Sequence, residues 1–212
     1  MDILNEDIQL NEKDLLITIL TKPKLSLEFI LKYCPNKYVT SLLVLNGITN
    51  ALDRNNLLLT NHKSISTVFL IVVLIIGGIF GPLLGNAYAA SLNWTGDWLN
   101  GKAKTDQFLT VIAWSTIPYV FSLVLLIPKL LFLDDGLFRI DMSDLTNPKS
   151  VIYIVIAFFE LALFIWSLVI LVKGIALIQK FSYGKAILNV VLPVLVLIIL
   201  IIIIFGIIYL IP

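Results

Sequence analysis

Residues 195–210, LVLIILIIIIFGIIYL, decide the class of this protein because they are apolar on every side of a helix. At 1.5 Å rise per residue, about 20 such residues cross a hydrocarbon core of about 30 Å, whereas a helix in water needs a polar face. Three further blocks, 64–96, 107–128 and 150–172, contain Glu160 as their single charged residue. The sequence therefore predicts an integral membrane protein that crosses the bilayer several times.

The composition excludes several other classes of protein. Hydrophobic residues make up 59% of the chain and charged residues 14%, and the net charge is +1. We expect no nucleic-acid partner, because such proteins carry clusters of Lys and Arg in clear excess. One cysteine, Cys34, and one histidine, His62, provide neither an internal disulfide nor a zinc site. We therefore predict no metal, no cofactor and no enzymatic activity.

The predicted fold is all-α: a polytopic membrane bundle of five transmembrane helices over residues 15–212, after a polar tail at 1–14. The spans are expected at 39–59, 65–91, 107–128, 150–173 and 186–211. The first span is interrupted by Asn46 and Asn50, so we expect its polar side to be shielded by other helices. Before it, Leu25, Phe29 and Tyr33 share one face of a short amphipathic helix among lysines, which is typical of an interfacial helix.

Lysine and arginine near the spans predict the orientation. With five spans and the N-terminus inside, ten basic residues fall on the inner side: Lys13, Lys22, Lys24, Lys32, Lys37, Lys102, Lys104, Lys173, Lys180 and Lys185. Five fall outside: Arg54, Lys63, Lys129, Arg139 and Lys149. If residues 39–59 do not cross the membrane, the count of inner to outer basic residues is again ten to five, and the C-terminus is inside. We expect a cytoplasmic N-terminus, and the bias toward Ile, Leu, Lys and Asn favours a bacterial inner membrane.

A stripe of small residues recurs every four positions in the second span: Gly77, Gly81, Gly85 and Ala89. Small residues at this spacing let another helix approach closely, which is the main packing device in membranes. The partner helix is either part of the same chain or belongs to a second copy. We favour packing inside the monomer over homodimerisation, because a five-helix bundle has many internal contacts to make.

Glu160 lies near the middle of the fourth span, where a charge is costly. It is a candidate proton or cation site. The alternative is a protonated carboxyl that forms a hydrogen bond with a neighbouring helix, and Tyr119 is the candidate partner at similar depth in the third span. We favour the structural role, because one acid without a second ionisable group is little for coupled transport.

Depth along the spans suggests a second cluster of candidate residues. Trp114 and Trp166 each lie seven residues inside a cytoplasmic span end, and Asn86 and Asn189 fall nearer the same surface. They could line a shallow cytoplasmic-side pocket. The alternative, which we favour, is an aromatic belt with interhelical hydrogen bonds.

Residues 96–102, GDWLNGK, match the phosphate-loop pattern GxxxxGK. That loop binds nucleotides only between a strand and a helix, with Ser or Thr after the lysine. Here a membrane helix precedes the pattern and Ala103 follows it. We therefore expect no nucleotide ligand.

Several local motifs resemble the bacterial branch of the Yip (Ypt-interacting protein) domain family from about Leu15 to the end. They are Lys22-Pro23-Lys24 before the amphipathic segment, the glycine-rich second span, Gly101-Lys102-Ala103, Ala113-Trp114-Ser115 with Pro118, Trp166-Ser167 with Lys173-Gly174, and Ala186 to Asn189. The resemblance implies five membrane helices with a cytoplasmic N-terminus. In eukaryotes the family is tied to Rab-type GTPases and vesicle traffic; for bacterial members it implies no established activity and no catalytic residues.

Two classes of function remain after this comparison of motifs. The first is a non-enzymatic membrane scaffold or adaptor that binds lipid, partner proteins or a second copy of itself. The second is a small transporter or channel component that uses Glu160.

Overall fold

The computed structural model describes residues 14–58, 67–133 and 148–210, and every regular element in these ranges is a helix. The elements in chain order are α1 (Leu15–Thr21), α2 (Pro23–Tyr33), α3 (Val39–Leu58), α4 (Thr67–Trp98), α5 (Thr105–Ser115), α6 (Ile117–Val120), the 3-10 helix η1 (Phe121–Leu125), α7 (Leu126–Leu133), α8 (Pro148–Gln179) and α9 (Tyr183–Leu210). The predicted all-α class is confirmed. The polar tail lies outside the described residues except for Asp14.

Four segments of the described chain are long and apolar enough to cross a bilayer: Ile71–Trp98, Thr105–Lys129, Pro148–Gln179 and Tyr183–Tyr209. The first predicted span is a shorter apolar helix, Val39–Leu52, inside α3. These helices confirm an integral, multi-pass membrane protein. Helix α4 continues to Trp98 and α8 to Gln179, beyond the predicted ends at 91 and 173, since nothing there breaks the backbone hydrogen bonding.

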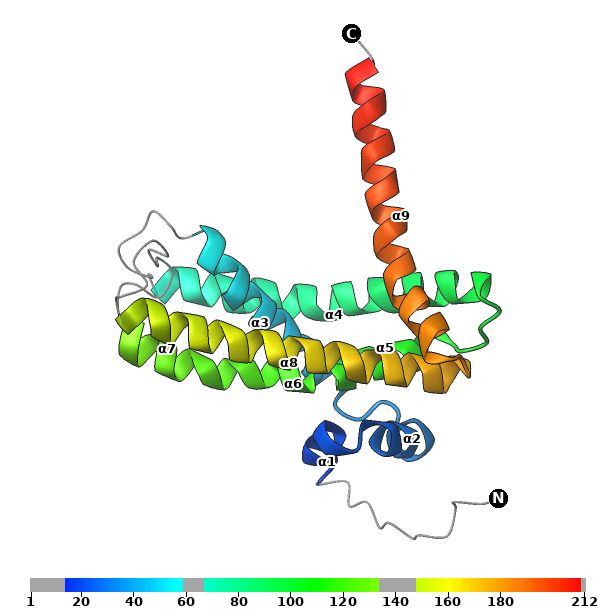
Figure 1. Ribbon diagram of the computed structural model, residues 1–212, viewed down its shortest axis with the longest axis horizontal. Helices are drawn as coiled ribbons and strands as arrows, with labels where there is room; N and C mark the ends of the chain where they lie inside the picture. Colours follow the sequence, from blue (N-terminus) through cyan, green and yellow to red (C-terminus); the bar gives the residue numbers. More distant parts are fainter. Residues whose placement is uncertain (1–13, 59–66, 134–147, 211–212) are drawn as a thin grey trace.

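Helices α4, α8 and the series α5–α7 run side by side along the long axis, and α3 crosses α4 obliquely (Figure 1). The third span is not one regular helix, because it divides at Thr116 and passes through η1. Pro118 and Pro128 each remove a backbone N–H that would bond four residues back, to Trp114 and Val124. The two prolines thus explain where this span loses α-helical geometry.

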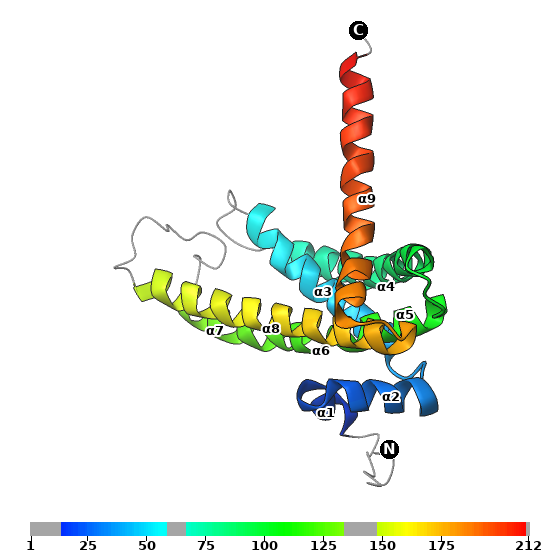
Figure 2. The ribbon, with the colours of Figure 1, turned by 45° about the vertical axis from the view of Figure 1, so that its right-hand side comes forward.

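Helices α1 and α2 lie against one flank of the bundle (Figure 2). Proline 23 occupies the first turn of α2, where its missing N–H costs nothing. Leu27 and Ile30 are fully buried, whereas Tyr33, on the face predicted to be interfacial, is 61% exposed. Phe29, also on that face, is partly buried against the core, so the bundle covers part of the face and leaves Tyr33 exposed.

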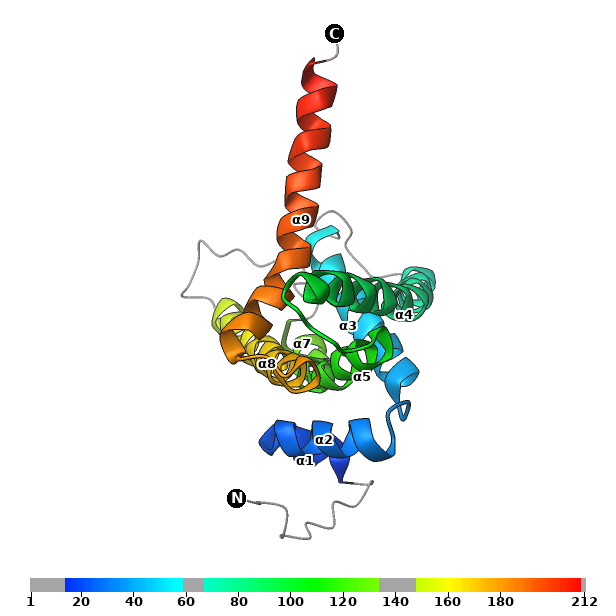
Figure 3. The same ribbon diagram turned by 90° about the vertical axis from the view of Figure 1, so that its right-hand side faces the viewer.

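Helix α9 leaves the bundle at a steep angle to α4 and α8 (Figures 1 and 3). Ala186 and Asn189, in its first turns, are buried, whereas the helix from Val194 onward is largely exposed. The stem is apolar all round, so its sequence distinguishes no face for packing. Its uncovered surface is suited to hydrocarbon.

Candidate functional site

The glycine stripe of α4 packs against α3 of the same chain. A methyl group on Gly77 would lie 2.7 Å from the carbonyl oxygen of Gly47 and 2.8 Å from Ile48 Cα. One on Gly81 would collide with the carbonyl oxygen of Leu43. Such contacts between backbones are possible only where side chains are absent. The stripe therefore brings α3 and α4 into direct contact inside the monomer.

Two further members of the stripe also face the protein. Gly85 lies against the Leu43 side chain, and Ala89 is fully buried. The sequence did not identify Gly47 of α3 as the residue that opposes the stripe. The signal was available: a glycine in a short span is a candidate partner for a small-residue stripe elsewhere.

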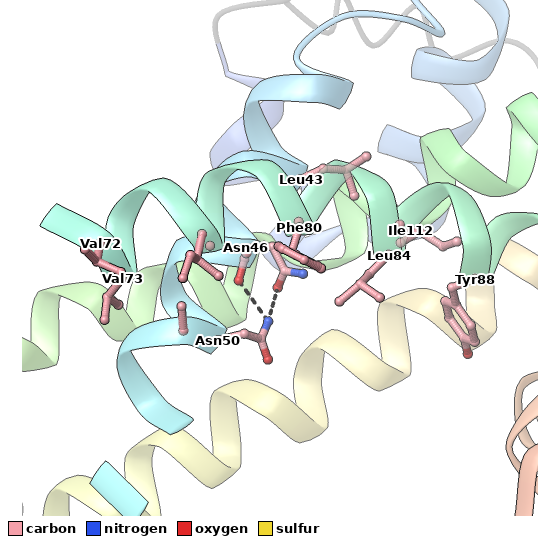
Figure 4. A pocket seen from close by; sticks show the side chains of 15 residues that line it. Leu43, Asn46, Asn50, Val72, Val73, Phe80, Leu84, Tyr88 and Ile112 are labelled. Carbon is pink, nitrogen blue, oxygen red and sulfur yellow. Dashed lines mark hydrogen bonds between the residues drawn. The ribbon is translucent and has the colours of Figure 1, made fainter. Parts of the chain in front are cut away.

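Beside this crossing α3 and α4, together with Ile112 of α5, line a groove of about 570 Å³ (Figure 4). Its α4 wall carries residues spaced by four positions: Val72, Ile76, Phe80, Leu84 and Tyr88. Helix α3 contributes Asn46 and Asn50. A mainly apolar groove with a few polar groups is the usual form of a small-molecule site.

The two asparagines form a hydrogen-bonded pair on α3. Asn50 Nδ2 donates to the backbone oxygen of Asn46 at 2.8 Å and to its Oδ1 at 3.2 Å (Figure 4). Among the described residues, Asn46 Nδ2 and Asn50 Oδ1 have no hydrogen-bond partner. A polar group left without a hydrogen-bond partner in an apolar medium is unfavourable. The groove therefore presents one free donor group and one free acceptor.

Glu160 pairs with Lys129 of α7, with Nζ and Oε1 2.5 Å apart. The exposed fractions of the two side chains are only 5% for Lys129 and 21% for Glu160. Lys129, one of the five basic residues expected on the outer side, lies within α7 and supplies the second ionisable group next to Glu160. Sequence reasoning missed it because Lys129 immediately follows the predicted end of the third span.

Tyr119, the predicted partner of Glu160, belongs to α6 and packs against a part of α8 that follows Glu160. Its backbone N–H donates to Ser167 Oγ at 3.1 Å, and its ring packs against Phe164 with 6.1 Å between centroids. These contacts hold α6 against α8. A joint role of Tyr119 and Glu160 stays a prediction.

The two tryptophans of the predicted cytoplasmic-side pocket form hydrogen bonds with the N-terminal segment. Trp114 Nε1 donates to the Lys37 oxygen and Trp166 Nε1 to the Leu20 oxygen, each at 3.1 Å. Trp114 is fully buried. The indoles therefore tie the link before α3 and the end of α1 to the bundle.

The two asparagines of that predicted pocket have other partners. Asn189 Nδ2 donates to the Leu92 oxygen and to Thr95 Oγ1, which holds the start of α9 on α4. Asn86 Nδ2 donates to the Pro82 oxygen in its own helix. The structure thus gives the four residues separate partners, and a ligand shared by all of them stays a prediction.

The side chain of Gln179 fills the turn between α4 and α5. Its Oε1 accepts from the N–H groups of Lys102 at 2.7 Å and Ala103 at 3.0 Å. A methyl group on Gly101 would collide with this carboxamide. In a phosphate loop such N–H groups face the phosphates, but here a protein oxygen engages them. The GxxxxGK pattern therefore has a structural explanation.

Four lysines in or next to α2, α8 and α9 lie over aromatic rings. The distances from Nζ to the ring centroid are 4.9 Å for Lys32–Tyr33, 5.3 Å for Lys37–Tyr38, 5.6 Å for Lys173–Trp166 and 5.8 Å for Lys185–Phe181. We call these eight residues the lysine–aromatic rim. Lysines and amphipathic rings are enriched where a protein crosses the headgroup region.

Comparison with known families agrees with this architecture. The family profile of the Yip1 domain matches residues 22–205, from the start of α2 into the stem of α9. The chain belongs to the Yip1 domain family. No curated protein and no solved structure gives a significant match.

The matched Yip1 domain includes the α3–α4 glycine contact and the α2 helix that packs on the bundle. The Yip1 family is not known for enzymatic activity. Within the described residues, no group of three or more His, Cys, Asp or Glu side chains could hold a metal ion.

Proposed function

We propose that this Yip1 domain protein is a non-enzymatic membrane scaffold or adaptor that binds anionic lipid headgroups and acidic protein partners through its lysine–aromatic rim. The observation that supports this most directly is the docking of the N-terminal helices, because two tryptophan hydrogen bonds hold α1 and the link before α3 on the bundle. Each lysine near an anionic surface contributes about 1 kcal/mol.

The proposed orientation places the rim in the cytoplasm of a bacterial cell and the protein in the inner membrane. The ten-to-five distribution of basic residues supports an inside N-terminus. With five crossings, Pro212 lies outside. Alkaline phosphatase, which is active only outside, should therefore be active when fused after Pro212. A fusion that is inactive there, together with an active cytoplasmic reporter at the same position, would contradict five crossings.

Neutralising the rim should weaken the binding of anionic lipid. We expect the purified protein with Lys32, Lys37, Lys173 and Lys185 all changed to Gln to bind phosphatidylglycerol about tenfold or more weakly, since four attractive charges are lost. The matched control changes the same residues to Arg and keeps affinity. Native mass spectrometry measures how much phosphatidylglycerol each variant retains, with phosphatidylcholine as the comparison lipid. Equal retention of phosphatidylglycerol by the Gln variant and the unchanged protein would refute the rim as a lipid surface.

A transporter or channel component is the second candidate, and the Lys129–Glu160 pair is the observation that favours it. Ionisable pairs inside a membrane mark many proton paths. Under our scaffold proposal, vesicles containing the protein and a pH-sensitive dye leak protons no faster than empty vesicles. Proton flux that disappears in the double variant Lys129→Met with Glu160→Leu would establish the second function instead.

A further inference from the structure

The α3–α4 groove has a long and mainly apolar wall. Its α4 wall runs from Val72 to Tyr88, which at 1.5 Å per residue is about 24 Å long. Ile76 and Phe80 within it are 48% and 49% exposed. The groove opens from helices that lie at membrane depth, where hydrocarbon chains are the most abundant possible occupants. An apolar wall of this kind suits part of one such chain.

The polar side chains of the groove restrict which kind of ligand can bind there. None of the residues that line it is charged. Its polar side chains include Asn46, whose Nδ2 has no partner among the described residues. Asn46 and Phe80 both line this groove (Figure 4). A suitable occupant is therefore apolar along most of its length and supplies an uncharged hydrogen-bond acceptor at the level of Asn46.

We propose that this groove binds one chain of an ester-linked glycerolipid, with the ester carbonyl accepting a hydrogen bond from Asn46 Nδ2 and the first part of the chain along the α4 wall on one side of Asn46. An ester carbonyl is uncharged, is a good acceptor and is attached directly to a long chain. It satisfies the free carboxamide N–H in a medium that has no water to do so. A phosphate at the same place would meet no cation. The site thus recognises the acyl chain and its ester group, and the headgroup lies outside the groove.

This site is distinct from the lysine–aromatic rim, which none of the groove residues belongs to. The two proposals therefore fail independently. Loss of phosphatidylglycerol preference in rim variants says nothing about the groove, and the groove experiment uses a lipid without net charge.

A photoactivatable phosphatidylcholine with a diazirine in one acyl chain tests the groove in the full-length protein in vesicles. Peptide mapping should find the label in 72–88 and in the part of α3 that holds Asn46 and Asn50. Ile76→Trp should reduce this labelling about tenfold or more, because the indole fills the space of the chain. Ile79→Trp is the control: Ile79 is on the same helix, is 63% exposed and does not line the groove. Equal labelling of both variants, or labelling spread evenly over all spans, overturns the proposal.

The ester carbonyl is tested with a diazirine lipid in which ether bonds replace both esters. The unchanged protein should prefer the ester lipid about two- to tenfold, the net effect of one hydrogen bond. Asn46→Leu should bind both lipids equally, and a melting curve verifies that this variant is folded. Equal binding of ester and ether lipids by the unchanged protein overturns the role of Asn46.

Discussion

Gly81→Ala should lower the melting temperature of the purified protein by about 3–10 °C, the range for an overpacked contact in a protein of this size. The added methyl group would meet two backbone atoms: the Leu43 carbonyl oxygen and, at 2.9 Å, Gly47 Cα. Backbone in a helix cannot retreat as a flexible side chain can. The axes of α3 and α4 must therefore separate, and dispersion contacts along the whole crossing are lost.

Gly78→Ala is the matched control for this prediction. Gly78 precedes Gly81 by less than one turn, but a methyl group there would approach only Val44 Cγ1, at 3.8 Å. Alanine also favours a helix over glycine by about 1 kcal/mol, so Gly78→Ala should leave the melting temperature unchanged or raise it slightly. Gly81→Leu should be more harmful than Gly81→Ala. If Gly81→Ala and Gly78→Ala melt alike, the close crossing does not stabilise the fold.

Lys129→Met should destabilise the protein by about 3–5 kcal/mol, because it leaves the Glu160 carboxylate without its cation at membrane depth. Glu160→Gln should also destabilise, since Lys129 then loses its counter-charge. This result separates two hypotheses for Glu160. A protonated carboxyl in a neutral hydrogen bond would tolerate Gln, whereas an ion pair does not.

The double variant Lys129→Met with Glu160→Leu completes the cycle. With both charges removed, no unpaired ion remains, and we expect stability close to that of the unchanged protein. Thermal unfolding of all four proteins in the same detergent measures the coupling. Strictly additive losses in the double variant would show that the two side chains do not stabilise each other. Lys129→Arg, which keeps the charge, serves as the control for a change in side-chain shape.

The sequence alone determined the membrane class and most of the spans, because hydrophobic length is a property of a continuous segment. It also located the glycine stripe, since residues four apart lie on one face of any helix. The depth of Glu160 followed from its distance to the span ends.

Only the tertiary structure decided which groups meet. Gly47 opposite the stripe, Lys129 beside Glu160, and Gln179 in the α4–α5 turn are partners far apart in the chain, and their meeting depends on how helices dock. The direction of α9 also came only from the structure. A stem that is apolar on all sides determines that the helix enters hydrocarbon, but it carries no asymmetry that could say which neighbour it faces.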